Sequence, residues 1–512
     1  MHFLLNSITK LTATSDEPPI CNDDIKIQIF INNINLIYNL YYTINMGLAK
    51  IKDILNIKKH LQVYIFSALF ALFLVSSILY IYKENVIFPI INFVILFSHL
   101  ILYKGKYRIY ALFLYVPFIV FFNYKPLNIG SFFSYFVLLY CLIVLIENLI
   151  KKDSFTNIEF RRITICLFLF IYVAILTLIY ANIKELPRLI SIFGYIFSIG
   201  FFIIDFKSSK NFEKIVFLIT FGFLIANLIA CFIFYIVKGN IATTFLKRFV
   251  SEKYAQQYNN PNSSFRYPGL SGDPNYLGFY VLFLSAIVLV NIKKLNHKPI
   301  FVVLVLLLQI FPIVGQSKNY IICFIAFVIA FCTIISFKNK YGLLITASTL
   351  AALLMALILS QSFLAPVILR FINLDFRNGF INAMTTGRFN IQLSYFNKFL
   401  SDPSSFIIGR GFGSLYNDAS AHNIYVMSIW YFGIFGSFIY VLYIISFINI
   451  KSLKINKFNL LPLIIILVCG LSLDFISYAE MFIFLLFTYY LSTKPLADTY
   501  LIDKQHFNEE YI

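Results

Sequence analysis

The sequence has few charged residues for its length and only one tryptophan. Of its 512 residues, 12% are charged, whereas 60% are hydrophobic and 19% are aromatic. A soluble globular domain carries roughly 25% charged residues. The shortage of charge excludes a soluble protein and indicates a polytopic membrane protein. Because a multispan bundle of this size usually packs as one unit, we expect no second soluble module.

Cysteine is scarce as well, and the signatures of several enzyme classes are missing. Six of the seven cysteines lie inside apolar runs and none lies in a long loop, so we interpret them as packing residues. The chain has no DxD for a metal-bound nucleotide sugar, no GxSxG, no P-loop and no histidine cluster for zinc. We therefore expect neither a metal nor a cofactor.

What the chain does contain is a series of long apolar runs. A helix that crosses the hydrocarbon core needs about 20 apolar residues. Fourteen runs approach this length, namely 62–82, 86–103, 108–123, 128–149, 163–181, 188–205, 214–237, 274–291, 299–315, 319–336, 342–363, 424–448, 459–473 and 475–492. The sequence thus predicts an all-α polytopic membrane protein with about 14 transmembrane helices, within a range of 12 to 14.

The net charge of +18 comes from short clusters of Lys and Arg between these runs. If the N-terminus is cytoplasmic, 24 positive charges fall in the cytoplasmic connections, where Lys10 and Lys26 of the N-terminal tail are not counted, and five fall in the short external connections. This bias follows the positive-inside rule, so we expect both termini in the cytoplasm and no nucleic-acid partner. Residues 1–57 then form a cytoplasmic tail, with Met46 as an alternative start. Residues 58–494 form a single transmembrane bundle and 495–512 a second cytoplasmic tail.

Two connections, 238–273 and 364–423, are much longer than the others, and both fall outside the cell under this topology. Long loops without a domain of their own are usually functional or disordered. In the second loop, LAPVILRFINLDFRNGFINAM and FNIQLSYFNKFL place large apolar residues at helical spacing, with polar residues between them. They predict two amphipathic helices that lie on the bilayer surface or cap the bundle.

The predicted topology leaves one of the six histidines outside, His422, at the end of the second long loop. It directly precedes a span whose Gly433 and Gly436 permit close helix contact. Because the unperturbed pKa of imidazole lies near working pH, His422 is a candidate general base. The alternative is an interfacial histidine that snorkels or caps a helix.

Three external arginines are candidates for binding a phosphate, because the guanidinium group is planar and permanently charged. Arg266 lies in a turn rich in proline and glycine before a span, Arg388 begins the second amphipathic segment, and Arg410 lies in IIGRGFGS. A charge that faces lipid headgroups is the alternative for each. Ser317 and Lys318 form a short external turn, in which Lys318 is either an anchor or a third basic contact.

Asp273 and Asn275 belong to an Asp-Pro-Asn sequence that is typical of a helix start, with Asp as the N-cap and Pro at the first position. This structural role is favoured, and a ligand-binding role is the alternative. Gly409, Gly411 and Gly413 resemble a phosphate-binding loop only superficially, since a lone glycine-rich stretch is a weak signal.

Five motifs, taken in order, resemble the O-antigen ligase and O-antigen polymerase superfamily. They are RYPGLSGDPN (266–275), GQSK (315–318), TTGR (385–388), GRGFG (409–413) and AHN (421–423), and the resemblance covers roughly residues 260–450. Each motif is weak alone, but their order, spacing and common predicted side make the set specific. The chain departs from the family because the tryptophan that often follows Arg388 is missing, and Lys318 stands where the family often has Arg.

The resemblance implies a metal-independent glycosyltransferase of the bacterial inner membrane, which transfers a glycan from a polyprenyl-diphosphate-linked donor to an acceptor hydroxyl. It implies that Arg266 and Arg388 bind the donor diphosphate and that His422 activates the acceptor. The residues that it implies for substrate binding are Arg410, Lys318, Ser317, Asp273, Asn275 and Asn423. The implied partners are the lipid-linked oligosaccharide and the glycan acceptor, with a chain-length regulator or a flippase as a candidate protein partner.

Polymerisation of O-antigen, capsule or exopolysaccharide repeat units is the favoured function. An O-antigen ligase, which transfers finished polymer to a lipid core, would use the same chemistry. A polysaccharide flippase or transporter is the alternative from another class. Such a protein usually needs facing acidic residues inside the spans, whereas Glu147 and Asp205 lie at span ends and Asp474 and Glu480 near the last external turn.

Overall fold

The computed structural model of the chain contains helices and no strand in the part that it describes. That part comprises residues 59–83, 85–103, 106–123, 132–151, 157–181, 183–205, 212–250, 252–260, 266–338, 388–417, 420–476 and 479–493. The predicted tails 1–57 and 495–512, the predicted span 342–363 and the first predicted amphipathic segment lie outside it. The chain divides into two units, Met1–Ala71 and Leu72–Ile512, and the packing described below is that within the second unit.

The elements follow one another as helices, with η marking short 3-10 or π segments. They are α3 (Lys59–Tyr82), α4 (Ile87–Leu102), α5 (Lys106–Tyr115), η1 (Val116–Phe122), α6 (Phe132–Lys151), α7 (Asn157–Tyr180), η3 (Ile183–Glu185), α8 (Leu186–Asp205), α9 (Phe212–Cys231), η5 (Phe232–Val237), α10 (Gly239–Phe245), η6 (Leu246–Val250), α11 (Glu252–Asn259), η7 (Gly269–Ser271), α12 (Pro274–Val290), η8 (Ile292–Lys294), α13 (Lys298–Val314), α14 (Lys318–Lys338), α18 (Arg388–Ser401), α19 (Pro403–Ile407), α20 (Ile424–Ile445), α21 (Ile450–Ile455), η10 (Lys457–Asn459), α22 (Leu460–Gly470) and α23 (Ala479–Thr493).

The thirteen predicted runs that the structure describes are all helical, which confirms the all-α class for that part of the chain. Among the described residues, seven helical stretches are long and apolar enough to cross a membrane, and they lie in α3, α6, α7, α8, α9 with η5, α14 and α20. The other apolar helices, α4, α5 with η1, α12, α13, α22 and α23, are shorter. The chain is therefore a helical membrane protein, and the count of fourteen spans stays a prediction.

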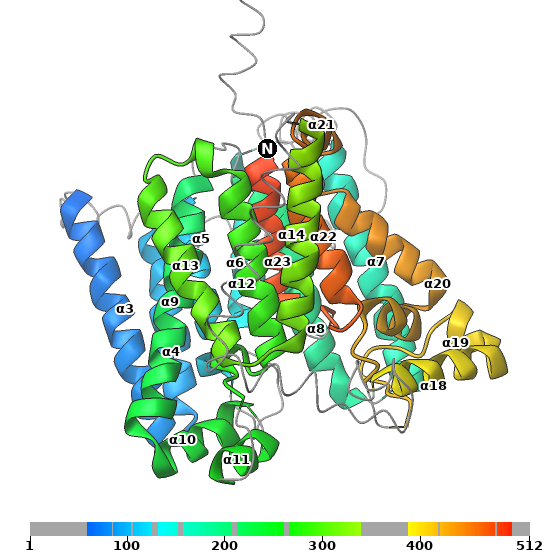
Figure 1. Ribbon diagram of the computed structural model, residues 1–512, viewed down its shortest axis with the longest axis horizontal. Coiled ribbons are helices and arrows are strands. Elements are labelled where there is room, and N and C mark those ends of the chain that lie inside the picture. Colours follow the sequence, from blue (N-terminus) through cyan, green and yellow to red (C-terminus); the bar gives the residue numbers. More distant parts are fainter. Residues whose placement is uncertain are drawn as a thin grey trace, which may run out of the picture. The chain divides into compact units, whose positions relative to one another are not determined.

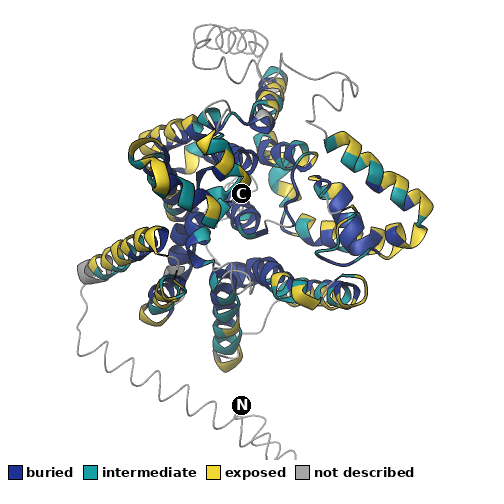
Figure 2. Ribbon diagram, turned by 90° about the horizontal axis from the view of Figure 1, so that it is seen from below, coloured by how far each residue is buried: buried dark blue, intermediate teal, exposed yellow. Residues whose placement is uncertain are grey.

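Helix α12 lies at the centre of the packing. Every residue from Pro274 to Val288 is buried, and α12 packs against α13, α14, α22 and α23. A helix that is apolar on all sides has no face for water and fills a core. By contrast, only 28% of the most apolar segment of α7 is buried, whereas 78% of the corresponding segment at α8 is buried. Figure 2 shows the exposed residues along the outer faces of the peripheral helices, where lipid would cover them.

Both long loops contribute to the same end of the bundle (Figure 1). Helices α10 and α11 of the first loop and α18 and α19 of the second lie there, while α21 lies at the opposite end; we call the former the loop end. At the opposite end, the Lys294 Nζ donates to the Ser492 carbonyl at 2.6 Å and the Asn449 Nδ2 to the Thr493 carbonyl at 3.0 Å. The connections around Lys294 and Asn449 therefore lie at one end and the described parts of the two long loops at the other, which agrees with the side that the sequence predicts for each.

The two long loops differ in how far the sequence predicted them. Helices α10 and α11 and the turns η6 and η7 occupy most of the described part of the first loop, and the sequence analysis did not predict them. The second predicted amphipathic segment is helical and forms α18. Tyr395 and Phe399 are buried, whereas Leu393, Phe396 and Leu400 are exposed. These exposed residues recur at intervals of three and four and so share one apolar face, which suits a bilayer surface.

Candidate functional site

The side-chain oxygen of Asn275 joins three elements at the loop end. The Arg266 Nη2 donates to the Asn275 Oδ1 at 3.3 Å, and the Ser317 hydroxyl donates to the same oxygen at 3.1 Å. The Ser317 Oγ in turn accepts the backbone N–H of Tyr320 in the first turn of α14, at 3.1 Å. Asn275 and Ser317 are 5% and 1% exposed. Asn275 therefore fixes Arg266 against the starts of both α12 and α14.

Asp273 has the structural role that the sequence favoured. Its Oδ1 accepts the backbone N–H of Asn275 at 2.7 Å, so it is the N-cap of α12, with Pro274 at the first position. Its Oδ2 accepts the hydroxyl of Tyr254 in α11 at 3.4 Å. The same carboxylate acts electrostatically on Arg388 and His422. Asp273 thus caps α12 and also supplies negative charge to the site.

Arg388 is brought to the same place from the start of α18. Its Nη1 donates to the backbone carbonyl of Ser472, in the turn between α22 and α23, at 2.7 Å. Burial lowers the pKa of Arg388, and the like charge of Arg266 lowers it further, while Asp273 and Tyr276 act in the opposite direction. Since an arginine stays charged in proteins, the described residues of the site combine two guanidinium groups with the carboxylate of Asp273. Within the described residues, the buried Nε of Arg266 has no hydrogen-bond partner.

His422 lies beside this charge cluster, just before α20. Its backbone has a φ of 49°, in the left-handed region that few residues other than glycine adopt, and its N–H donates to the Ser420 Oγ at 3.2 Å. Burial by the surrounding chain lowers the pKa of His422, the charge of Arg388 lowers it further, and Asp273 partly offsets both. The side chain nevertheless remains exposed. An accessible imidazole held neutral near pH 7 can accept a proton.

Asn423 positions His422. Its Oδ1 accepts the backbone N–H groups of Tyr425 and Val426, at 2.9 and 3.2 Å, which makes it the N-cap of α20. Its Nδ2 donates to the Leu471 carbonyl at 3.2 Å. The Asn423 amide is thus engaged within the protein, and it ties the start of α20 to the same turn that receives Arg388.

The turn between α22 and α23 is the part of the site that the sequence analysis missed. Besides accepting from Arg388 and Asn423, it is held by Tyr276, whose hydroxyl donates to the Asp474 carbonyl at 2.9 Å and accepts the Asp474 N–H at 3.1 Å. Asp474 was noted only as an acid near the last external turn. Backbone carbonyls carry no sequence signal, so nothing in the chain could have identified Ser472 as a partner of Arg388.

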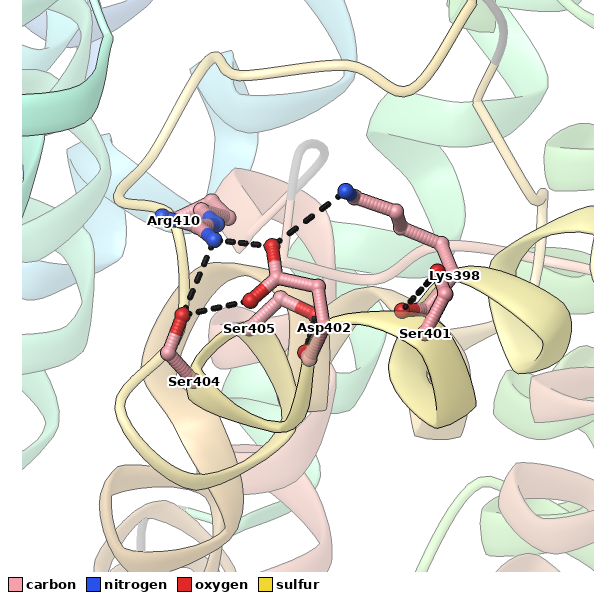
Figure 3. A network of polar contacts seen from close by, with 6 residues as sticks. All are labelled: Lys398, Ser401, Asp402, Ser404, Ser405 and Arg410. Carbon is pink, nitrogen blue, oxygen red and sulfur yellow. Dashed lines mark hydrogen bonds and ion pairs between the residues drawn. The ribbon is translucent and has the colours of Figure 1, made fainter.

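Arg410 belongs to a different network, shown in Figure 3. Its guanidinium donates to the Asp402 carboxylate and, at 3.0 Å, to the Ser404 hydroxyl. Lys398 forms a second ion pair with Asp402 at 3.3 Å. The hydrogen bond from Ser404 and these two cations hold the pKa of Asp402 well below its usual range. The Arg410 guanidinium also lies 4.8 Å from the centroid of the Tyr180 ring. It is used within the protein because an acid eight residues earlier pairs with it.

The glycine-rich turn that contains Arg410 serves the backbone of α20. The sequence predicted one continuous span, but α20 is interrupted at Gly433, where φ is 66° and ψ is 178°. The backbone N–H groups of Arg410 and Gly411 donate to the carbonyls of Trp430 and Tyr431, at 2.7 and 3.1 Å. A broken helix in a membrane protein is tolerated where other protein groups satisfy the freed backbone. The GRGFG motif does this, and these two N–H groups are not left free for a phosphate.

Of the nine predicted site residues, six are joined by hydrogen bonds or electrostatic interactions. They are Arg266, Asp273, Asn275, Ser317, Arg388 and His422. Asn423 adjoins them through the backbone, and Arg410 is engaged elsewhere. For Lys318 the structure describes only the backbone, which begins α14. The arrangement combines two cations for an anion with an accessible base, at the positive N-terminal end of α12.

Comparisons with known proteins give the chain no relative. No family model matches it, and no curated protein and no solved structure shows significant similarity to it.

Proposed function

We propose that the chain transfers a glycan from a polyprenyl-diphosphate-linked donor to an acceptor hydroxyl, and that it polymerises the repeat units of a surface polysaccharide. The observation that carries this proposal is the grouping of Arg266, Arg388 and His422 at one end of a membrane bundle. Two guanidinium groups suit a diphosphate, and a neutral imidazole beside them suits an acceptor hydroxyl. The location proposed is the bacterial inner membrane, with both termini cytoplasmic and the loop end outside.

In the proposed reaction, the acceptor hydroxyl oxygen attacks the anomeric carbon of the donor sugar. The bond from that carbon to the diphosphate oxygen breaks, and the hydroxyl proton passes to the imidazole of His422. Arg266 and Arg388 stabilise the charge that develops on the leaving diphosphate. By analogy with a single oxyanion donor, the loss of one such contact costs roughly 2.7–4 kcal/mol in the transition state. We therefore expect Arg388→Ala to lower kcat by about 100- to 1,000-fold.

The test uses the full chain in proteoliposomes with lipid-linked repeat units as substrate. We expect His422→Ala to abolish chain growth while binding of the donor persists. His297→Ala is the matched control, because His297 is an exposed histidine just before α13, at the opposite end of the bundle. Normal chain growth with His422→Ala, or an equal loss in both variants, contradicts the role of His422. If the chain were a flippase, His422→Ala would leave its transport activity unchanged.

Polymerase and ligase are distinguished by the glycans of a deletion strain. If the deleted protein is a polymerase, the strain carries single repeat units on the acceptor. If it is a ligase, long polymer remains on the lipid carrier. The proposed orientation is tested by impermeant thiol reagents on intact cells. The exposed Asn417 at the loop end, changed to Cys, should be labelled, while Lys454→Cys in α21 should be protected. The reverse pattern rejects the proposed topology and the external active site with it.

A further inference from the structure

A cavity of about 240 Å³ lies beside the charge cluster. It is lined by η1, α9, η6, η7 and the starts of α12 and α23. Ser271 and Gly272 line it, and the next residue is Asp273, which caps α12 in the cluster. A single water needs only roughly 10–15 Å³ of such space. The cavity therefore has room for a group much larger than a water molecule, close to the proposed diphosphate site.

Two hydrogen-bond acceptors on the cavity wall have no donor from another residue in the part of the chain that the structure describes. Within the described residues, the buried Asn123 Oδ1 has no hydrogen-bond partner. The partly buried carboxylate of Glu480, near the start of α23, receives no hydrogen bond from another residue in that part of the chain, although the charge of Arg188 acts on it. Buried acceptors are normally satisfied, and an ionisable group inside a membrane bundle marks a functional site by default. The wall therefore favours a ligand that donates hydrogen bonds.

Much of the remaining wall is apolar or aromatic, with Phe223, Phe249 and Tyr280 among its residues, and Asn227 and Ser271 add polar groups to it. A carboxylate disfavours an anion, and a bare metal ion would leave most of this space and all of the rings without contacts. A sugar ring fits both halves of the wall, because its hydroxyl groups donate and its C–H faces pack on aromatic rings. We propose that this cavity binds one sugar ring of the lipid-linked glycan, with Glu480 and Asn123 accepting its hydroxyl hydrogen bonds.

This inference rests on the proposed glycan transfer, so its test must separate the two. The probes are the lipid-linked glycan extracted from cells and the same polyprenyl diphosphate without glycan, each bound to the full chain in nanodiscs. We expect the glycan to strengthen binding to the native chain. Glu480→Gln keeps the shape of the side chain but removes its charge, and should weaken binding of the glycan-bearing lipid roughly 10- to 100-fold. Binding of the bare lipid should not change, which also shows that the variant is folded.

A second variant tests the space itself. Ala226 is a buried residue of α9 on the cavity wall, and Ala226→Leu should fill part of the cavity and weaken the same lipid selectively. Arg388→Gln should weaken both lipids. If Glu480→Gln and Ala226→Leu leave glycan binding unchanged while Arg388→Gln still weakens both lipids, the cavity proposal is wrong and the proposed function stands. If the native chain binds neither lipid, both proposals are wrong.

Discussion

Asn275→Asp separates the charge of the proposed diphosphate site from its architecture. The substitution keeps the acceptor that receives Arg266 at 3.3 Å and Ser317 at 3.1 Å, and it replaces the amide nitrogen by oxygen. Beside Arg266 the new carboxylate stays ionised, so the net positive charge of the cluster falls by one. Two unit charges about 4 Å apart interact by about 4 kcal/mol at an effective dielectric constant of 20. We expect diphosphate binding to weaken by roughly 2–4 kcal/mol, or about 30- to 900-fold.

Asn275→Ala is the matched comparison, because it removes the acceptor without adding charge. It leaves the Ser317 O–H donor and one Arg266 donor without their acceptor, and should lower the free energy of unfolding by about 1–3 kcal/mol. Asn275→Asp should therefore bind diphosphate more weakly than Asn275→Ala, whereas Asn275→Ala should be less stable than Asn275→Asp. Thermal unfolding in detergent and binding of polyprenyl diphosphate, with neutral polyprenol as the blank, measure the two quantities. If Asn275→Asp binds diphosphate as well as the native chain does, the anion site has been placed wrongly.

Two further predictions concern the base and the broken helix. Because Arg388 lowers the pKa of His422, Arg388→Gln should raise that pKa, and the acid limb of kcat/KM should move to higher pH; an unmoved limb means that His422 is not the base. At Gly433, a φ of 66° with a ψ of 178° lies in a region almost confined to glycine, so Gly433→Ala costs about 1–3 kcal/mol in backbone strain. The new Cβ would also lie 2.3 Å from the Ile407 carbonyl oxygen, so the backbone must shift. Gly239→Ala has a similar φ of 58° but open space, and equal losses of unfolding free energy in the two variants would contradict the close approach.

Much of the fold was predictable because hydrophobic length is a local property. Each apolar run defines a helix without knowledge of its neighbours, and the thirteen runs within the described residues are all helical. The interruption of α20 was not predictable in this way. It depends on backbone groups of Arg410 and Gly411, about twenty residues earlier, meeting the carbonyls that the break releases. Gly433 was noted for close helix contact, but its neighbour is this turn, which periodicity does not reveal.

The site shows the same division between local and tertiary information. The N-cap at Asp273 follows from its own sequence, and the structure confirms it. From their local sequence, Arg388 and Arg410 are both candidates for binding a phosphate, because both follow a glycine in the predicted second loop, and only the resemblance gives them different roles. Only the structure shows that Arg410 pairs with Asp402, whereas Arg388 reaches the Ser472 carbonyl and the neighbourhood of Arg266. Partner choice between equally placed charges is a tertiary property.

Asp273 has a consequence for turnover under the proposed function. A site that only had to bind diphosphate would not keep a carboxylate beside Arg388 and His422, since that charge opposes the ligand. An enzyme must also release diphosphate, and the carboxylate limits how tightly the two guanidinium groups hold it. Asp273→Asn preserves the cap, because Asn is an equally good N-cap. We expect tighter diphosphate binding and slower release, measured by product inhibition.

Since Asp273 raises the pKa of His422, Asp273→Asn should also move the acid limb of kcat/KM to lower pH, opposite to Arg388→Gln. If the acid limb moves in the same direction in Asp273→Asn and in Arg388→Gln, these two charges do not act on one base.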